Sequence, residues 1–192
     1  MKKIKDSMAV GILGGLIGVV CMDISSYILW RNKKTESLHG HLAGSMIMNP
    51  FKLNKRKNFM IGQIFHMTVA IGIGVGMVEI LKRYGKDHHN LKAGFLSVAT
   101  WGILYNFGQK MGFYKMNPRL IKSSYAEIWQ HLVYGLVTSN AIVALADPTI
   151  FSKEASINMQ ATTHAENSVQ SMQPIYSDIN YKKEEGSQPY SN

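Results

Sequence analysis

Seven polar side chains that could carry out chemistry interrupt the long apolar segments of this sequence: Asp23, Gln63, His66, Asn106, Gln109, Glu127 and His131. A carboxylate beside two imidazoles can pass protons or bind a divalent metal ion. In this interpretation Asp23 and Glu127 bind the proton or cation. His66 and His131 are the relays or ligands. The sequence leaves the identity of a metal unknown, and it contains no nucleotide-binding loop, CxxC or HExxH motif.

The seven side chains fall at two depths if the apolar segments are antiparallel helices. Four of them lie six or seven residues from the segment end at one common face, namely Asp23, His66, Asn106 and His131. At a rise of 1.5 Å per residue, they lie about 10 Å below that interface. Gln63, Gln109 and Glu127 follow one turn nearer the surface. The sequence therefore predicts a polar layer that faces the interior of a helix bundle.

Two interpretations of this layer remain open. Polar groups in hydrocarbon are costly, so they usually face the bundle interior and pair with each other. In the structural interpretation, Asp23 pairs with His66 or His131, and each such bond contributes only about 0.6 kcal/mol. In the functional interpretation, the layer lines a cavity. The spacing of four, three and four residues from Glu127 to Thr138, through His131 and Tyr134, places these side chains on one helix face and suits both interpretations.

Four apolar segments have to position these side chains. The first has 23 residues and one charged side chain, Asp23. A helix of that length rises about 34 Å, which is enough to cross the roughly 30 Å hydrocarbon core of a bilayer. The predicted fold is therefore all-α: a polytopic membrane protein with an antiparallel bundle of four transmembrane helices, at about residues 8–30, 59–81, 93–113 and 125–146.

Two further regions complete the predicted organisation. Leu38, Leu42 and Met46 recur every four residues, which predicts a short interfacial or re-entrant helix over residues 38–48. His39 and His41 are two residues apart and would point in different directions on a helix, so they are interpreted as interface histidines. Residues 1–148 form the predicted membrane domain. Residues 149–192 are polar and without periodicity, which predicts a disordered tail.

The first apolar segment also carries four glycines, Gly11, Gly14, Gly15 and Gly18. They form two overlapping pairs with four-residue spacing, and such small residues let membrane helices approach closely. One interpretation is packing inside the chain's own bundle. The other is a seam for a homo-oligomer.

Composition and charge bear on the partners of the protein. The chain has 192 residues and a net charge of +9, with 18 basic and 7 acidic residues before position 149. The basic residues cluster beside apolar segments, as expected for loops held at anionic lipid headgroups. The predicted partner is the lipid bilayer and not nucleic acid, and no cofactor is predicted. Cys21 is the only cysteine, so no internal disulfide forms.

The predicted location is the cell membrane, with several spans. The first segment is too long for a secretory signal and lacks a small-residue cleavage site, so we expect it to stay uncleaved. Eleven basic residues flank the first and third loops, against eight on the side of the termini when the count stops at Lys153. That count favours cytoplasmic loops, whereas the short basic N-terminus favours cytoplasmic termini. We expect the termini in the cytoplasm.

Two segments, GILGGLIGVVCMD and ESLHGHLAGSMIM, together with the basic stretch that follows, carry a family resemblance. They resemble small four-helix integral membrane proteins of Gram-positive, spore-forming bacteria. The resemblance covers residues 5–148, implies the membrane architecture and transfers no catalytic motif. We therefore expect a structural or interaction component of the membrane and not an enzyme. The alternative is a carrier or sensor for a small solute, a proton or a divalent metal that uses the polar layer.

Overall fold

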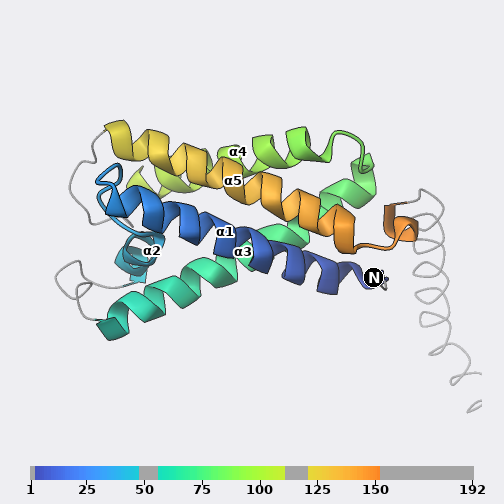
Figure 1. Cartoon of the computed structure of the whole chain (residues 1–192), viewed down its shortest axis with the longest axis horizontal. Coiled ribbons are helices and arrows are strands. Elements are labelled where there is room, and N and C mark those ends of the chain that lie inside the picture. Colours follow the sequence, from blue (N-terminus) through green and yellow to red (C-terminus); the bar gives the residue numbers. More distant parts are fainter. Residues whose placement is uncertain (1–2, 48–55, 111–120, 152–192) are drawn as a thin grey trace, which may run out of the picture. The chain divides into compact units, whose positions relative to one another are not determined.

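The structure is a computed structural model that describes residues 3–47, 56–110 and 121–151 (Figure 1). These residues form five α-helices and one short 3₁₀ helix. In chain order the elements are α1 (Ser7–Arg31), α2 (His39–Ile47), α3 (Arg56–Tyr84), α4 (His89–Lys110), α5 (Ile121–Leu145) and η2 (Pro148–Phe151). The described part of the chain has no strand, which confirms the predicted all-α class.

The elements fall where the sequence predicts them. Each of the four long helices overlaps one predicted apolar segment, and α2 occupies the predicted interfacial helix. The predicted tail begins too early, because η2 follows α5 directly and its Ile150 and Phe151 pack against the hydrophobic core. Residues 111–113 of the third predicted helix and residues 152–192 of the predicted tail lie outside the described residues.

Three of the described helices, α1, α3 and α5, are long and apolar enough to cross a membrane. This confirms membrane-capable helices at three of the four predicted positions. The fourth helix, α4, has 22 residues, but polar side chains recur along it and make it less apolar than the others.

The four glycines of α1 are all buried, and they divide between two neighbouring helices. Gly11 and Gly15 lie against α3, where a Cβ atom on Gly74 would stand 2.7 Å from the Cα of Gly15. Gly14 and Gly18 lie against α5. Glycines allow this close approach, because they have no side chain. Both glycine pairs therefore contribute to packing inside the chain.

The remaining helix contacts also form at small residues. On α3, Gly62 meets Gly40 and Gly44 of α2, and on α5, Gly135 meets Ala93 of α4. Together these contacts place α4, α5, α1 and α3 side by side in that order, and α2 packs against α3 (Figure 1). Each long helix is antiparallel to its long neighbours.

The N-terminal residues form hydrogen bonds with the end of α5. The backbone N–H of Ile4 donates to the carbonyl of Leu145 at 2.9 Å, and the N–H of Asp147 donates to the carbonyl of Ile4 at 2.8 Å. The ammonium of Lys3 also donates to the carbonyl of Ala144. The start of α1 and the end of α5 therefore lie at the same end of the domain, as an even number of antiparallel helices requires.

The carboxylate of Asp147 is predicted to make the stability of this end of the domain depend on pH. It is exposed and accepts hydrogen bonds from the Thr149 hydroxyl at 2.7 Å and the Thr149 N–H at 3.0 Å. These two hydrogen bonds hold the pKa of Asp147 below its ordinary value of 3.8, and the bond from the Thr149 hydroxyl has the larger effect. The two bonds therefore stabilise the folded protein above pH 3.8, and this stabilisation is lost as the pH falls through the lowered pKa of Asp147. We expect Thr149→Ala to raise this pKa in an NMR titration of the carboxyl carbon, and Thr68→Ala to leave it unchanged. An unshifted midpoint in Thr149→Ala would contradict the assigned cause.

Tyr134 makes a buried hydrogen bond between two helices that flank α1. Its side chain is 2% exposed, and its hydroxyl donates to the carbonyl of Ala70 at 2.6 Å. We expect Tyr134→Phe to lower the free energy of unfolding by about 0.6–1.5 kcal/mol. The measurement is an SDS titration of the protein in mixed micelles. Tyr125→Phe is the matched control, because Tyr125 is 69% exposed. Equal losses in both variants would contradict a specific role for the Tyr134 bond.

Candidate metal centre

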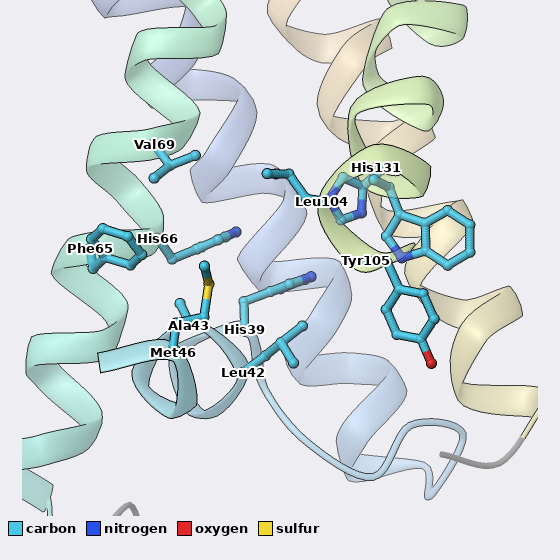
Figure 2. Close-up of a pocket in the computed structure, with 11 residues that line it drawn as sticks. His39, Leu42, Ala43, Met46, Phe65, His66, Val69, Leu104, Tyr105 and His131 are labelled. Atoms are coloured by element: carbon cyan, nitrogen blue, oxygen red, sulfur yellow. The ribbon is translucent and has the colours of Figure 1, made fainter. Parts of the chain in front are cut away.

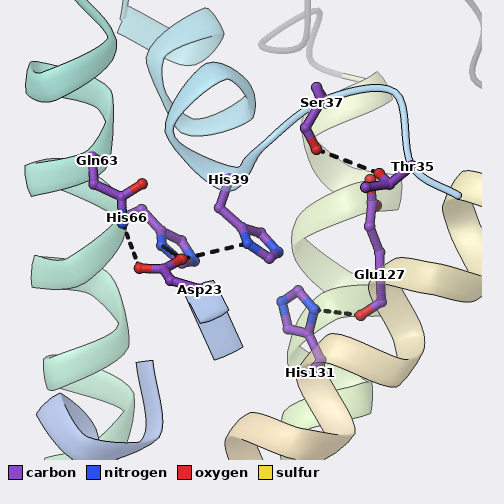
Figure 3. Close-up of polar contacts among 8 residues, drawn as sticks. All are labelled: Asp23, Thr35, Ser37, His39, Gln63, His66, Glu127 and His131. Atoms are coloured by element: carbon purple, nitrogen blue, oxygen red, sulfur yellow. Dashed lines mark hydrogen bonds and ion pairs between the residues drawn. The ribbon is translucent and has the colours of Figure 1, made fainter. Parts of the chain in front are cut away.

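Three side chains from three helices converge on one point: Asp23 of α1, His39 at the start of α2 and His66 of α3 (Figure 3). Asp23 Oδ1 lies 3.6 Å from His39 Nδ1 and 3.7 Å from His66 Nδ1. One potential ligand atom from each residue lies within 4.8 Å of the other two. The two imidazoles stack, with ring centroids 4.6 Å apart and an interplanar angle of 4°. We call these three residues the Asp-His-His cluster.

The glycine contacts explain why these residues meet. Gly15 and Gly74 fix the register of the antiparallel helices α1 and α3. Eight residues onward from Gly15 is Asp23, and eight residues back from Gly74 is His66, so the two side chains arrive at the same height. The contact of Gly40 with α3 brings the adjacent His39 to the same place.

Gln63 orients the carboxylate of the Asp-His-His cluster. It lies one turn before His66 on α3, and its Nε2 donates to Asp23 Oδ2 at 2.5 Å. This bond leaves Oδ1 directed at the two imidazoles. Such support is common around metal ligands, because it fixes the orientation of the ligating atom.

The environment of the Asp-His-His cluster is largely closed to solvent. The side chains of His39, His66 and Asp23 are 5%, 15% and 27% exposed. Among the described residues, His66 Nδ1 is buried and has no hydrogen-bond partner. A buried nitrogen in that position gains free energy from any ligand that it can bind.

The spacing suits a small cation after a modest contraction. In a tetrahedral site with metal–ligand bonds near 2.1 Å, neighbouring ligand atoms lie about 3.4 Å apart. The two distances from Asp23 to the imidazoles exceed this value by only a few tenths of an ångström. The two imidazole nitrogens have to approach each other further.

A third imidazole lies beside the Asp-His-His cluster. The ring of His131 on α5 lies 6.0 Å from that of His39, edge-on at 74°. His131 Nδ1 is 2.9 Å from the backbone carbonyl of Glu127. Because a carbonyl only accepts, Nδ1 is the donor, and in the neutral ring Nε2 then keeps its lone pair. His131 is therefore next to the cluster without being part of it.

All three imidazoles line one cavity of about 200 Å³ (Figure 2). Its other walls come from α2, α3 and α4, and they are almost entirely apolar, with side chains such as Leu42, Met46, Phe65, Val69 and Leu104. Figure 2 shows His39, His66 and His131 on its sides. A metal ion in the Asp-His-His cluster would therefore have a coordination position that faces this cavity.

Glu127 has a different partner. Its side chain is 3% exposed and accepts a hydrogen bond from Trp101 Nε1 of α4 at 3.1 Å. The Trp101 indole stacks on Tyr105, with ring centroids 5.4 Å apart. This bond ties α4 to α5 one turn away from His131.

Two residues of the predicted polar layer do not face the interior. Asn106 and Gln109 are exposed on α4, and Asn106 Nδ2 donates to the Gly102 carbonyl of its own helix at 2.7 Å. The reason is the rotation of α4, which turns Trp101 inward instead. The structure brings Asp23, Gln63 and His66 together. His131 lies beside them on α5, and Glu127 lies one turn away from His131 on the same helix.

The interpretation of His39 as an interface histidine also needs correction, because the structure buries it in the cluster. A sequence signal was present: Gly40 and Gly44 follow it with the spacing of a close helix contact. His41 does point elsewhere. It packs on the Phe59 ring at 4.7 Å, and burial lowers the pKa of its imidazole.

Comparison of the chain with protein-family models, with curated proteins and with solved structures found no match. The functional argument therefore rests on the geometry of the Asp-His-His cluster and its cavity.

Proposed function

We propose that this protein is an integral membrane protein that binds one divalent transition-metal ion at Asp23, His39 and His66, and that it acts as a carrier of that ion or a sensor for it. The observation that supports the proposal is the convergence of one carboxylate oxygen and two imidazole nitrogens from three helices. Helices from separate parts of the chain rarely place three ionisable side chains together inside an apolar bundle without a use for them.

The chemistry of the three ligands limits which metal ions can bind. Imidazole nitrogen and carboxylate oxygen suit Zn²⁺, Fe²⁺ and Co²⁺, whereas Ca²⁺ and Mg²⁺ take oxygen ligands. Structural zinc sites usually have four protein ligands. Three protein ligands beside a cavity leave a position for water or for an incoming ligand. That arrangement favours an ion that exchanges, as a carrier or sensor requires.

The proposed membrane arrangement has four spans, with α4 as the fourth. This helix packs antiparallel along α5, and its 22 residues rise about 33 Å. Large apolar side chains remain exposed along it, namely Leu91, Phe95, Ile103 and Phe107, at 55–76%. In a bilayer these side chains contact lipid, which accounts for their exposure.

The proposed orientation places the termini in the cytoplasm of the cell. An impermeant maleimide applied to intact cells that carry Ser187→Cys in a Cys21→Ser background is expected to leave the protein unlabelled. Ready labelling would reverse the orientation.

A structural role is the second candidate function. The bonds of Gln63 to Asp23 and of Trp101 to Glu127 link pairs of helices, as polar contacts in a purely structural bundle do. Under this proposal the Asp-His-His cluster stabilises the bundle and has no need of a metal.

Cobalt binding separates the two candidates. The full chain, purified in lipid nanodiscs, is titrated with Co²⁺. We expect one ion per chain, the strong visible absorption of four-coordinate cobalt, and displacement by Zn²⁺. His88→Asn, which alters an exposed turn histidine, is the matched control and should bind equally well. The absence of saturable binding would overturn the metal proposal and favour the structural one. Metal flux into dye-loaded proteoliposomes then distinguishes a carrier from a sensor.

A further inference from the structure

A second cavity lies at the end of α1 that leads toward α2. It has a volume of about 430 Å³ and is lined by Trp30, Arg31, Lys33, Thr35, Glu36 and Lys122. Its walls come from the last turn of α1, the connection to α2 and the first turn of α5. Three cations and one carboxylate give it a net positive charge. We call it the cationic cavity.

Backbone hydrogen bonds at the end of α1 hold the main chain at Lys33, which carries one of these cations. The N–H of Lys33 donates to the carbonyl of Trp30 at 3.0 Å, and the N–H of Lys34 donates to that of Leu29 at 2.9 Å. Lys33 has a φ of 56°, in the left-handed region where helix ends usually carry glycine. A side chain at that position costs about 1 kcal/mol. The chain therefore keeps a lysine in the cationic cavity against the preference of its backbone.

If α1 crosses a bilayer, the cationic cavity would lie at the height of the lipid headgroups, because it adjoins the end of that helix. Trp30 is 39% exposed and contacts Tyr27, with ring centroids 6.0 Å apart. Aromatic side chains at the end of a membrane-capable helix mark the bilayer interface. Arg31 follows directly, at the helix C-terminus where the helix dipole favours a positive charge.

We propose that the cationic cavity binds the phosphate of an anionic membrane phospholipid, with Arg31, Lys33 and Lys122 as its cationic contacts. Free phosphate offers the same oxygens. The observations favour the lipid, because the cavity adjoins Trp30 at the end of an apolar helix, where a lipid phosphate is already concentrated. Glu36 lines the same cavity and limits its excess charge. The bound lipid would link α1 to α5 at the end opposite the Ile4 contact. This inference is independent of the proposed metal site.

Native mass spectrometry of the full chain in detergent tests the proposal. The protein is titrated with phosphatidylglycerol, with phosphatidylcholine, or with inorganic phosphate. We expect one phosphatidylglycerol to be retained with clear preference over the other two. Equal retention of phosphatidylcholine would overturn the proposal. Binding of inorganic phosphate as tight as that of phosphatidylglycerol would overturn the lipid assignment.

Two variants and one control locate the binding. Lys33→Gly removes a cation while suiting the left-handed backbone, so the protein should remain folded and bind phosphatidylglycerol about fivefold more weakly. The double variant Arg31→Gln with Lys122→Gln should weaken binding about twenty-fivefold. The control, Arg83→Gln with Lys86→Gln, removes two exposed cations at the other end of the domain and should change binding less than about twofold. A loss in the control equal to that of the double variant, or unchanged binding in Lys33→Gly, would overturn the proposal.

Discussion

Replacing Asp23 by asparagine is expected to remove stoichiometric metal binding while leaving the helices packed. Asparagine keeps the size of the side chain, and its amide oxygen can still accept the hydrogen bond from Gln63. It lacks the negative charge that, in the proposed site, would hold a divalent cation between His39 and His66. We expect the Kd for Co²⁺ or Zn²⁺ to rise by more than about tenfold, which corresponds to about 1.4 kcal/mol.

Matched variants separate ligation from stability. Asp147→Asn makes the same chemical change at an exposed carboxylate near the end of α5, and it should leave the metal affinity unchanged. His39→Gln and His66→Gln should each reproduce the loss seen in Asp23→Asn. Stability without metal should change by less than about 1 kcal/mol in Asp23→Asn. Undiminished metal affinity in Asp23→Asn would refute the site. A large loss of stability in metal-free protein would support the structural role instead.

Replacing Gly74 by valine is expected to destabilise the protein more than any other single change considered for the bundle. A Cβ atom there would lie 2.7 Å from both the Gly15 Cα and the Gly11 carbonyl oxygen, which are backbone atoms that cannot turn aside. The helices α1 and α3 must therefore separate. We expect a loss of about 3 kcal/mol in the free energy of unfolding. Metal affinity should fall as well, because the same contact sets Asp23 opposite His66.

Gly72→Val is the control for this substitution. Gly72 lies on the same helix only two residues away, is exposed, and has nothing within 4 Å of an added Cβ. Its replacement should change stability by less than about 1 kcal/mol, because a glycine in a helix interior is itself unfavourable. SDS titration and the Co²⁺ spectrum measure both properties. Similar losses in the two variants would show that the close contact between α1 and α3 does not determine stability.

The sequence was sufficient to predict the helices and the height of their polar residues. Apolar length decides whether a segment can cross a bilayer, and the rise per residue is constant in a helix. Counting from the helix ends therefore placed Asp23 and His66 at one height, and in the structure Asp23 Oδ1 lies 3.7 Å from His66 Nδ1. The same reasoning cannot give the rotation of a helix about its axis. Asn106 has the predicted height, but it lies on the outside of α4.

The rotation of each helix about its axis and the docking of α2 in the bundle depend on contacts with neighbouring helices, so only the tertiary structure decides them. The sequence of α1 showed two glycine pairs without showing that one faces α3 and the other α5. A short amphipathic helix such as α2 can lie on the membrane surface or dock inside the bundle, and its own sequence is compatible with both. The contact of Gly40 with Gly62 decides the matter, and it buries His39 beside Asp23. The length and polarity of each helix are local properties of the sequence, whereas the Asp-His-His cluster exists only through close contacts between residues that are far apart in the chain.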